Sequence, residues 1–453
     1  MIVNKKDKFH FIGIGGTGMS ALARILIQQG FIVSGSDISR SYVTDKLEKE
    51  GVHLFLNHAK ENIADAAAVV YSTAVAKENP EFQEAIARGL PLLHRSDFLL
   101  KLMQEKSPLL VTGTHGKTTT SSLLAHLLIK TGYDPSFAIG GIVRSIGSNG
   151  GHGKGAYFVA EADESDGSFL KYPPFGAIIT NIDNDHLDYW KSQQMLLEGF
   201  KQFSELVNSE EHFFWCSDDD KLSSLRISGV SYGFGEVAEL HIDDYRQEGW
   251  KNLFNLTFEG KKYDEIEVPL IGGHNVLNAS AVFGLGLRLG IAETDIRRAF
   301  AFFEGVNRRA EKKGEENGIT VYDDYAHHPT EIFATLRAMK HAANKRRLVV
   351  VFQPHRYSRT RDCMAEFPHA FYHADELIMT DIYAAGEAPI EGITTEMLLQ
   401  KVTNASAAKV KYVPRKELSA FLASFLKKGD ILVTMGAGDV TKVGPEILEF
   451  LKS

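Results

Sequence analysis

The sequence predicts an α/β protein built from three consecutive α/β domains, and three observations lead to this prediction. Apolar, strand-like runs alternate with helical patterns along the chain, which is typical of parallel βαβ units. Two glycine-rich loops, at residues 13–18 and 113–118, each follow an apolar run and precede a helix. A length of 453 residues exceeds one ordinary domain and favours two to four.

The first domain is expected over residues 1–105. The first glycine loop lies between an opening strand and a helix at about 19–29. Short buried strands, most of them separated by helical patterns, are expected at 9–14, 32–35, 69–72 and 91–93.

The second domain is expected over residues 106–314 and the third over 315–453. The second opens with a strand at 109–111, the second glycine loop and a helix at 121–130. The glycine-rich stretch 145–155 is expected to be a loop, and the polar stretch 311–318 marks the second boundary. Further strands are expected at 157–160, 177–180, 319–322, 348–352, 376–380 and 430–435.

The composition is that of a soluble globular protein, with 44% hydrophobic and 24% charged residues. Fifty basic and 58 acidic residues give a net charge of -8, which argues against general nucleic-acid binding. The two cysteines, Cys216 and Cys363, match no metal spacing and no disulfide framework, which favours a reducing compartment. The N-terminus lacks the features of a signal peptide, and no apolar run is long enough to span a membrane. We therefore expect a cytoplasmic protein.

The first glycine loop satisfies the pattern G-x-G-x-x-G through Gly13, Gly15 and Gly18. Asp37 ends the next strand, where a carboxylate that binds a ribose is expected. The glycines permit a tight turn, and a pyrophosphate can lie on the N-terminus of the following helix. A tight turn without a ligand is the alternative. The pattern indicates a nucleotide with a diphosphate group and leaves open which nucleotide this is.

The second glycine loop, GTHGKT, follows an apolar strand and precedes a helix. Backbone N–H groups in such a loop can surround phosphate oxygens, and the helix dipole favours their charge. Lys117 would neutralise the β- and γ-phosphates, and the Thr118 hydroxyl would bind Mg²⁺. The strict eight-residue pattern is not met, because Val111 stands where its first glycine belongs. A shorter relative of the P-loop makes a generic transport or switch NTPase less favoured.

Acidic clusters follow two later strands, in EADESD at 161–166 and in NIDNDHLD at 181–188. Ligands of open parallel sheets bind beyond the carboxyl ends of the strands, so these clusters should converge on the phosphate loop. Mg²⁺ prefers hard oxygen ligands, which suits Glu161 and Thr118. His186 is a softer ligand and would also tolerate Mn²⁺. A solvated loop carboxylate is the alternative for any single acid here.

Three polar groups lie in the last part of the chain. Asn275 and Asn278 share one face of a helix, where Asn275 either caps the helix or contacts a nucleotide. DDYAHHP at 323–329 and QPHRYSR at 353–359 each follow a strand. Arg356 and Arg359 could clamp a carboxylate or phosphate through paired hydrogen bonds, although a surface-loop role is plausible for either arginine alone.

Together these motifs resemble those of the Mur ligases of peptidoglycan synthesis, and the resemblance covers essentially the whole chain. It rests on segments that occur in the order HFIGIGGTGMS, SGSD, GTHGKTTT, EADESD, TNIDNDHLD, HNVLNA, DDYAHHPTE, FQPHRYSRT, YAAGEAPI and GAGD. The resemblance implies a Rossmann-like N-terminal domain that binds a UDP-sugar, a central P-loop ATPase-type domain, and a Rossmann-like C-terminal domain that binds an amino acid.

The resemblance also implies roles for individual residues. The implied metal ligands are Thr118, Glu161 and His186. The implied ATP contacts are Gly113, Thr114, His115, Gly116, Lys117, Thr118, Thr119, His274, Asn275, Asn278 and Asp323, the last of which would hold the ribose. The implied contacts to the UDP-substrate are Gly15, Gly16, Thr17, Gly18, Met19 and Asp37. The implied contacts to the amino acid and the muramoyl group are Tyr325, His327, His355, Arg356 and Arg359.

The implied activity joins L-alanine to the lactyl carboxylate of UDP-N-acetylmuramate through an acyl phosphate, with ATP and Mg²⁺ as cofactors. Lys117 is the expected catalytic lysine, and His186 or His327 is the candidate base for the amine. We expect no nucleic-acid or membrane partner, and a monomer or weak homodimer. Ala326 departs from the glycine usual in the family. Lys201 lies near the place of a carbamylated lysine in related ligases, but we do not assign it that role.

Three other functions compete with this one. The first glycine turn and Asp37 alone suggest an NAD-dependent oxidoreductase, which leaves the phosphate loop unexplained. A ligase of the same family attaches a preformed tripeptide to the same UDP-sugar, but the serine of EADESD and the start GIGGTGMS favour the alanine enzyme. A nucleotide-binding regulatory protein would bind ATP without releasing phosphate in response to an amino acid.

Overall fold

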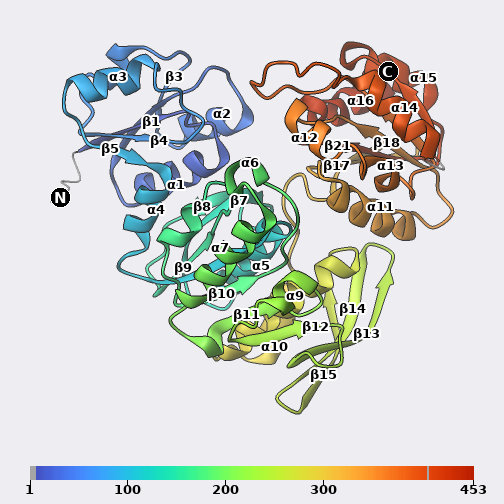
Figure 1. Ribbon diagram of the computed structural model, residues 1–453, viewed down its shortest axis with the longest axis horizontal. Helices are drawn as coiled ribbons and strands as arrows, with labels where there is room; N and C mark the ends of the chain where they lie inside the picture. Colours follow the sequence, from blue (N-terminus) through green and yellow to red (C-terminus); the bar gives the residue numbers. More distant parts are fainter. Residues whose placement is uncertain (1–6, 406–407, 453) are drawn as a thin grey trace. The chain divides into compact units, whose positions relative to one another are not determined.

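The computed structural model describes residues 7–405 and 408–452 and contains three β-sheets, whose elements are labelled in Figure 1. The chain divides into two compact units. Residues 1–6, which belong to the N-terminus considered above for a signal peptide, lie outside the described residues. Unit 1 comprises Met1–Asp243, Leu256–Tyr263 and Leu277–Glu304, and unit 2 comprises Asp244–Asn255, Asp264–Val276 and Gly305–Ser453. The three sheets with their helices confirm the predicted class of three α/β domains.

The first sheet is parallel, in the order β3-β2-β1-β4-β5. Its strands are β1 (Lys8–Ile12), β2 (Ile32–Ser36), β3 (His53–Phe55), β4 (Ala68–Tyr71) and β5 (Leu92–His94). The helices are α1 (Thr17–Gln28), α2 (Tyr42–Lys49), α3 (Pro80–Ala87) and α4 (Arg95–Met103). Strand order reverses at β1, so the glycine turn after β1 lies at the crevice where such sheets bind ligands.

The second sheet has ten strands, in the order β15-β14-β13-β12-β11-β10-β6-β9-β7-β8. Near its middle β6 (Ser107–Thr112) pairs in parallel with β10 (Gly176–Ile179) and β9 (Tyr157–Glu161). The other strands are β7 (Ser136–Val143), β8 (Ser148–Gly151), β11 (Phe213–Cys216), β12 (Val230–Gly233), β13 (Leu240–Glu248), β14 (Lys251–Phe258) and β15 (Lys261–Val268). The helices are α5 (Lys117–Lys130), α6 (Leu187–Trp190), α7 (Gln193–Glu205), α8 (Asp220–Ser224), α9 (Gly273–Arg288) and α10 (Glu293–Ala301).

The glycine-rich stretch 145–155 is not only a loop, as expected, because it contains β8, which pairs antiparallel with β7. Its glycines allow close packing against α1. A Cβ at Gly150 would lie 2.4 Å from the backbone oxygen of Ala21. Beside it, the buried Arg24 of α1 donates a hydrogen bond to Asn149. The glycines therefore join the first two sheets of unit 1.

The third sheet lies in unit 2, in the order β16-β17-β21-β18-β19-β20. The strands are β16 (Glu311–Glu316), β17 (Ile319–Asp324), β18 (Leu348–Phe352), β19 (Glu376–Met379), β20 (Lys409–Tyr412) and β21 (Ile431–Met435). All pairs are parallel except β16 with β17. The helices are α11 (Pro329–Ala343), α12 (Tyr357–Asp362), α13 (Phe367–Ala370), α14 (Thr395–Ala405), α15 (Leu418–Phe425) and α16 (Val443–Lys452).

Apolar side chains fill both faces of the third sheet. Val350 and Val433 belong to one core cluster, whereas Val349 and Leu432 belong to the other, as the alternation of side chains along a strand requires. The polar stretch 311–318 contains the edge strand β16, where charged side chains are tolerated, and the turn that follows it. None of the described helices combines the length and apolarity needed to cross a membrane.

Candidate functional site

The first glycine turn is held by the strand next to it. The amides of Gly13 and Ile14 donate to the Ser36 oxygen at 2.8 and 3.0 Å, and the amide of Gly15 donates to Asp37 Oδ2 at 2.9 Å. A Cβ at Gly15 would lie 2.7 Å from that carboxylate oxygen, so any larger residue would have to displace the Asp37 side chain. The structure thus brings the turn and Asp37 together, with the carboxylate bound to the turn itself.

The other predicted residues of this turn lie at the start of α1. Gly16 and Thr17 are exposed, whereas Met19 is buried in the core. The side chain of Met19 is therefore unavailable to a ligand, and only its backbone amide belongs to the free N-terminal turn of the helix. Arg95, which the sequence reasoning missed, packs over Gly18, where an added Cβ would lie 2.9 Å from Arg95 Nη1.

The phosphate loop joins β6 to α5 and is hydrogen-bonded to the segment that follows β10. Gly113 and Gly116 have φ of 125° and 85°, which favours glycine. The amides of Thr114 and His115 donate at 2.9 Å to the backbone and side-chain oxygens of Asn181. Asn278 lies against Gly116, where an added Cβ would be 2.9 Å from Asn278 Oδ1.

Further hydrogen bonds and one histidine–carboxylate contact hold this loop in place. Thr180 Oγ1 donates to the His115 oxygen at 2.6 Å, and the amide of Asp183 donates to Thr114 Oγ1 at 2.8 Å. His115 Nε2 lies 3.0 Å from Asp183 Oδ2. Thr119 is buried in the first turn of α5. The loop is preorganised to present its amides to an anion.

Lys117 is bound to a carboxylate that the sequence reasoning did not select. Its Nζ lies 2.8 and 3.0 Å from the oxygens of Glu164 and donates to the Gly113 oxygen at 2.6 Å. Burial disfavours the ammonium charge, but Glu164 and Asp163 outweigh burial and hold the pKa of Lys117 above its usual value. Glu164 is almost fully buried, and its backbone oxygen accepts from Trp190 Nε1 at 2.9 Å.

Thr118 and Glu161, two of the three expected metal ligands, lie together. Thr118 Oγ1 donates to Glu161 Oε2 at 3.3 Å, and Glu161 Oε1 accepts from Ser121 Oγ at 3.2 Å and from the Gly140 amide at 2.6 Å. Burial raises the pKa of Glu161, a penalty that a bound cation would offset. A hydroxyl and a carboxylate oxygen side by side fit the hard-oxygen preference of Mg²⁺.

His186, the third expected ligand, faces Glu164. Its Nε2 lies 3.9 Å from Glu164 Oε1 and 3.6 Å from Asp185 Oδ2, and its backbone has a φ of 60°.

Arg95 Nη2 lies 3.7 Å from Asp163 Oδ2, so one arginine touches both the glycine turn and the acidic cluster. Burial raises the pKa of Asp163, but Lys117 and Arg95 reverse the shift and lower it.

In unit 2, Asp323 is fully buried at the end of β17. Its oxygens accept from Thr434 Oγ1 and Thr441 Oγ1, each at 2.7 Å, and Arg308 Nε lies 3.2 Å away. The guanidinium of Arg308 also lies 4.9 Å above the ring of Tyr325. Sequence reasoning selected Asp323 and Tyr325 but missed the arginine that joins them.

The predicted histidines and arginines of unit 2 meet at the ends of β17 and β18. The rings of His327 and His355 are 5.8 Å apart, and Arg359 Nη1 lies 3.5 Å from His355 Nδ1. Burial, with His327 and the two nearby arginines, lowers the pKa of His355 to about 3. Tyr383, which was not predicted, stacks on His355 at 5.7 Å, and its backbone oxygen accepts from the Arg356 amide at 2.8 Å.

The expected ATP contacts at the start of α9 fall in different units. His274 and Asn275 belong to unit 2 and Asn278 to unit 1. Asn275 is the third residue of α9, and its side-chain Nδ2 donates to the Ile271 oxygen at 2.8 Å, so it is not the N-cap. Ala326 is buried without a positive φ, so this backbone position does not require glycine.

Comparisons with known proteins match successive parts of the chain to the same protein family. Family models match for the Mur ligase family catalytic domain over residues 8–107, the Mur ligase middle domain over 111–286, and the Mur ligase glutamate ligase domain over 308–438. A UDP-N-acetylmuramate–L-alanine ligase of Protochlamydia amoebophila is 49% identical, with 99% of each chain covered.

Solved structures give the same result. A UDP-N-acetylmuramate–alanine ligase of Thermotoga maritima matches with a TM-score of 0.86 and 30% identity, with 98% of each chain covered. A murein peptide ligase of Psychrobacter arcticus matches with a TM-score of 0.72 and 23% identity over the same share of each chain, a likeness of fold alone.

Proposed function

This chain belongs to the Mur ligase family, and we propose that it is an ATP-dependent ligase that joins L-alanine to UDP-N-acetylmuramate in peptidoglycan synthesis. The observation that carries the proposal is the phosphate loop, with Lys117 Nζ and the oxygens of Thr118 and Glu161 at the carboxyl ends of β6 and β9. The full-length similarity to alanine-adding ligases supports this activity over that of an NAD-dependent oxidoreductase.

The reaction begins with ATP on the phosphate loop. A lactyl carboxylate oxygen attacks the γ-phosphorus, the bond to the β-phosphate oxygen breaks, and an acyl phosphate and ADP form. The reactants are both anionic, so Lys117 aligns and partly neutralises them. Thr118 and Glu161, with His186, would hold Mg²⁺, which supplies further neutralisation of the phosphates when bound.

The second step forms the amide bond. The uncharged amine of L-alanine attacks the acyl carbon, phosphate leaves from the tetrahedral intermediate, and the amine proton passes to a base. His186 and His327 are the candidates for that base. Tyr325, His355, Arg356 and Arg359 would orient the amino acid and the muramoyl group, and Asp323 with His274, Asn275 and Asn278 would bind the nucleoside of ATP.

The glycine turn at residues 15–19 with Asp37 would bind the diphosphate of the UDP-substrate. We also propose domain boundaries near residues 105 and 314. The β5 to β6 connection and the start of β16 support them. A cytoplasmic monomer or weak homodimer fits the substrates and the free cysteines.

Phosphate release tests the proposed function. The purified chain is given ATP, Mg²⁺ and UDP-N-acetylmuramate, and release is measured with L-alanine, L-serine, glycine or the tripeptide used by the recycling ligase. Release that depends on L-alanine and on the UDP-sugar is expected. Release that needs the tripeptide would assign the recycling activity, and nucleotide binding with no amino-acid-dependent release would reject a ligase.

A further inference from the structure

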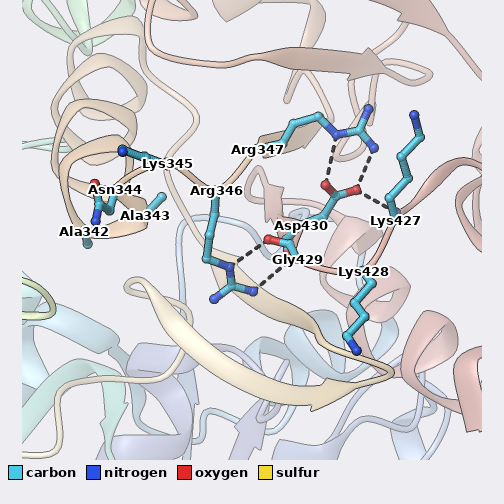
Figure 2. Close-up of a pocket in the computed structure, with 10 residues that line it drawn as sticks. All are labelled: Ala342, Ala343, Asn344, Lys345, Arg346, Arg347, Lys427, Lys428, Gly429 and Asp430. Carbon is cyan, nitrogen blue, oxygen red and sulfur yellow. Dashed lines mark hydrogen bonds and ion pairs between the residues drawn. The ribbon is translucent and has the colours of Figure 1, made fainter.

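An open pocket of about 730 Å³ lies in unit 2, at the edge of the third sheet where β18 and β21 begin (Figure 2). Leu348 pairs with Ile431 in parallel register, so the loops before these strands lie side by side. The pocket is lined by Ala342, Ala343, Asn344, Lys345, Arg346, Arg347, Lys427, Lys428, Gly429 and Asp430.

This edge is the opposite one from the candidate site of unit 2. Asp323 ends β17 and His355 follows β18, whereas the pocket residues precede β18 and β21. A five-residue strand spans about 16 Å, so a ligand in this pocket would not reach the histidines and arginines of the site.

Five basic side chains surround the pocket, and one of them is neutralised by an ion pair, while Arg346 interacts electrostatically with Glu315. Arg347 forms a bidentate ion pair with Asp430, with Nη2 to Oδ2 at 2.6 Å and Nε to Oδ1 at 3.0 Å. The other four make no ion pair within the described parts of the chain, and these are Lys345, Arg346, Lys427 and Lys428. The whole chain carries a net charge of -8, so this local excess of positive charge runs against its overall balance.

Arg346 is held rigidly at the pocket. Its Nε donates to the Gly429 oxygen at 2.7 Å, and its Nη2 donates to the Asp430 oxygen at 2.9 Å and to Thr320 Oγ1 at 2.8 Å. No acceptor for Nη1 is found among residues 7–405 and 408–452. Figure 2 shows the side chains of Lys427 and Lys428 extending away from Asp430, and no hydrogen bond or ion pair of either ammonium group is found within the described residues. A fixed arginine with a free donor and flexible lysines nearby are the groups that bind phosphate oxygens.

We propose that this pocket binds a phosphate-bearing anion, either a free diphosphate compound or the headgroup of an anionic phospholipid. Its volume lies in the range typical of small-molecule sites and exceeds the need of a single phosphate. Attraction between the unpaired cations and the phosphate drives binding, so the affinity falls as salt rises.

The test compares two double variants of the full chain that change the net charge equally. Lys427→Glu/Lys428→Glu alters the pocket, and Lys401→Glu/Lys416→Glu alters two exposed lysines elsewhere in unit 2. Pyrophosphate is titrated by calorimetry with excess ADP present to occupy the phosphate loop. In a second arm, sedimentation is measured with phosphatidylglycerol vesicles and with phosphatidylcholine vesicles.

We expect the pocket variant to weaken binding of pyrophosphate or of phosphatidylglycerol vesicles by about tenfold or more, and the control variant to change it by less than about twofold. Binding in the first arm alone identifies a free phosphate compound, and binding to phosphatidylglycerol vesicles identifies the lipid source. The proposal is overturned if neither probe binds, if both variants weaken binding equally, or if the pocket variant only lowers the melting temperature.

Discussion

Lys117 and Glu164, 47 residues apart in the sequence, form a buried ion pair in which Nζ lies 2.8 Å from Oε2. The same ammonium group is the one expected to meet the phosphates of ATP. Glu164 offsets the charge of this lysine inside the loop, and we expect the phosphate oxygens of ATP to compete with the carboxylate for it.

Glu164→Gln should destabilise the protein most when nucleotide is absent. The change removes the carboxylate bonded to the Lys117 ammonium, which is left with neutral hydrogen-bond acceptors and with acids that lie farther away. This loss costs about 1–3 kcal/mol of folding stability. ATP supplies the missing negative charge, so the loss of melting temperature should shrink at saturating ATP. Thermal unfolding with and without ATP measures this, with Glu205→Gln, an exposed acid of α7, as the control. An equal loss under both conditions would show that Glu164 does not act as a stand-in for phosphate.

Lys117→Ala should lower turnover by about a thousandfold, because a fixed charge at the transferred phosphoryl group is lost. Binding of UDP-N-acetylmuramate should change by less than about twofold, since the glycine turn is untouched. Phosphate release and calorimetry measure the two effects, and Lys130→Ala at the exposed end of the same helix is the control. Retained ligase activity would remove Lys117 from the proposed mechanism.

Glu161→Gln should raise the Mg²⁺ concentration needed for half-maximal phosphate release by about tenfold or more. The glutamine side chain keeps one oxygen to accept the hydrogen bond from the Gly140 backbone N–H, but it loses the negative charge that a divalent cation requires. Thr118→Ser, which keeps the hydroxyl, should stay near the parent value. An unchanged Mg²⁺ requirement in Glu161→Gln would move the metal site elsewhere.

The eleven strands expected from apolar runs, with both glycine loops, could be predicted from the sequence, because a buried parallel strand is a short continuous apolar run. The strands β3, β7, β8, β11 to β16 and β20 were not predicted. The partner of Lys117 could not be predicted either. Val111 pairs with Glu161 in the register of β6 and β9, and this register brings the turn after β9 to the loop. The residue pattern does not rank the acids of EADESD, and the family resemblance selected only Glu161. The fold adds that Glu161 lies beside Thr118 and that Glu164 lies beside Lys117. β8 was missed because glycine signals a loop even where it serves close packing against α1.

Tyr383→Ala should raise the KM for L-alanine by up to about tenfold and change kcat less. The ring stacks on His355 at an interplanar angle of 10°, and such ring contacts contribute about 0.5–1.5 kcal/mol. Tyr383→Phe keeps the ring and should restore the KM, because the contact to Arg356 uses backbone atoms. Steady-state kinetics with varied L-alanine separates the two parameters. A Phe variant as poor as the Ala variant would contradict a positioning role for the ring.

Asp324→Asn should remove a pH dependence of stability that the buried carboxylate imposes. Burial raises the pKa of Asp324 to about 6, although the amides of Ala310 and Ala326 donate to its oxygens at 2.6 and 2.8 Å. The folded pKa lies above the unfolded one, so the neutral acid's contribution to stability is complete below pH 4 and is lost as the pH rises through 6. Two pKa units correspond to roughly 3 kcal/mol.

The parent protein should therefore lose stability relative to Asp324→Asn between pH 4 and pH 7, although the variant itself is weakened at every pH by the loss of one acceptor. Thermal unfolding of both proteins across this range gives the difference, in which the titration of all other groups cancels. Asp362→Asn, at an exposed acid of the same unit, should follow the parent curve. A constant difference between parent and Asp324→Asn would mean that Asp324 stays ionised throughout, with Arg309 and the two amides outweighing burial.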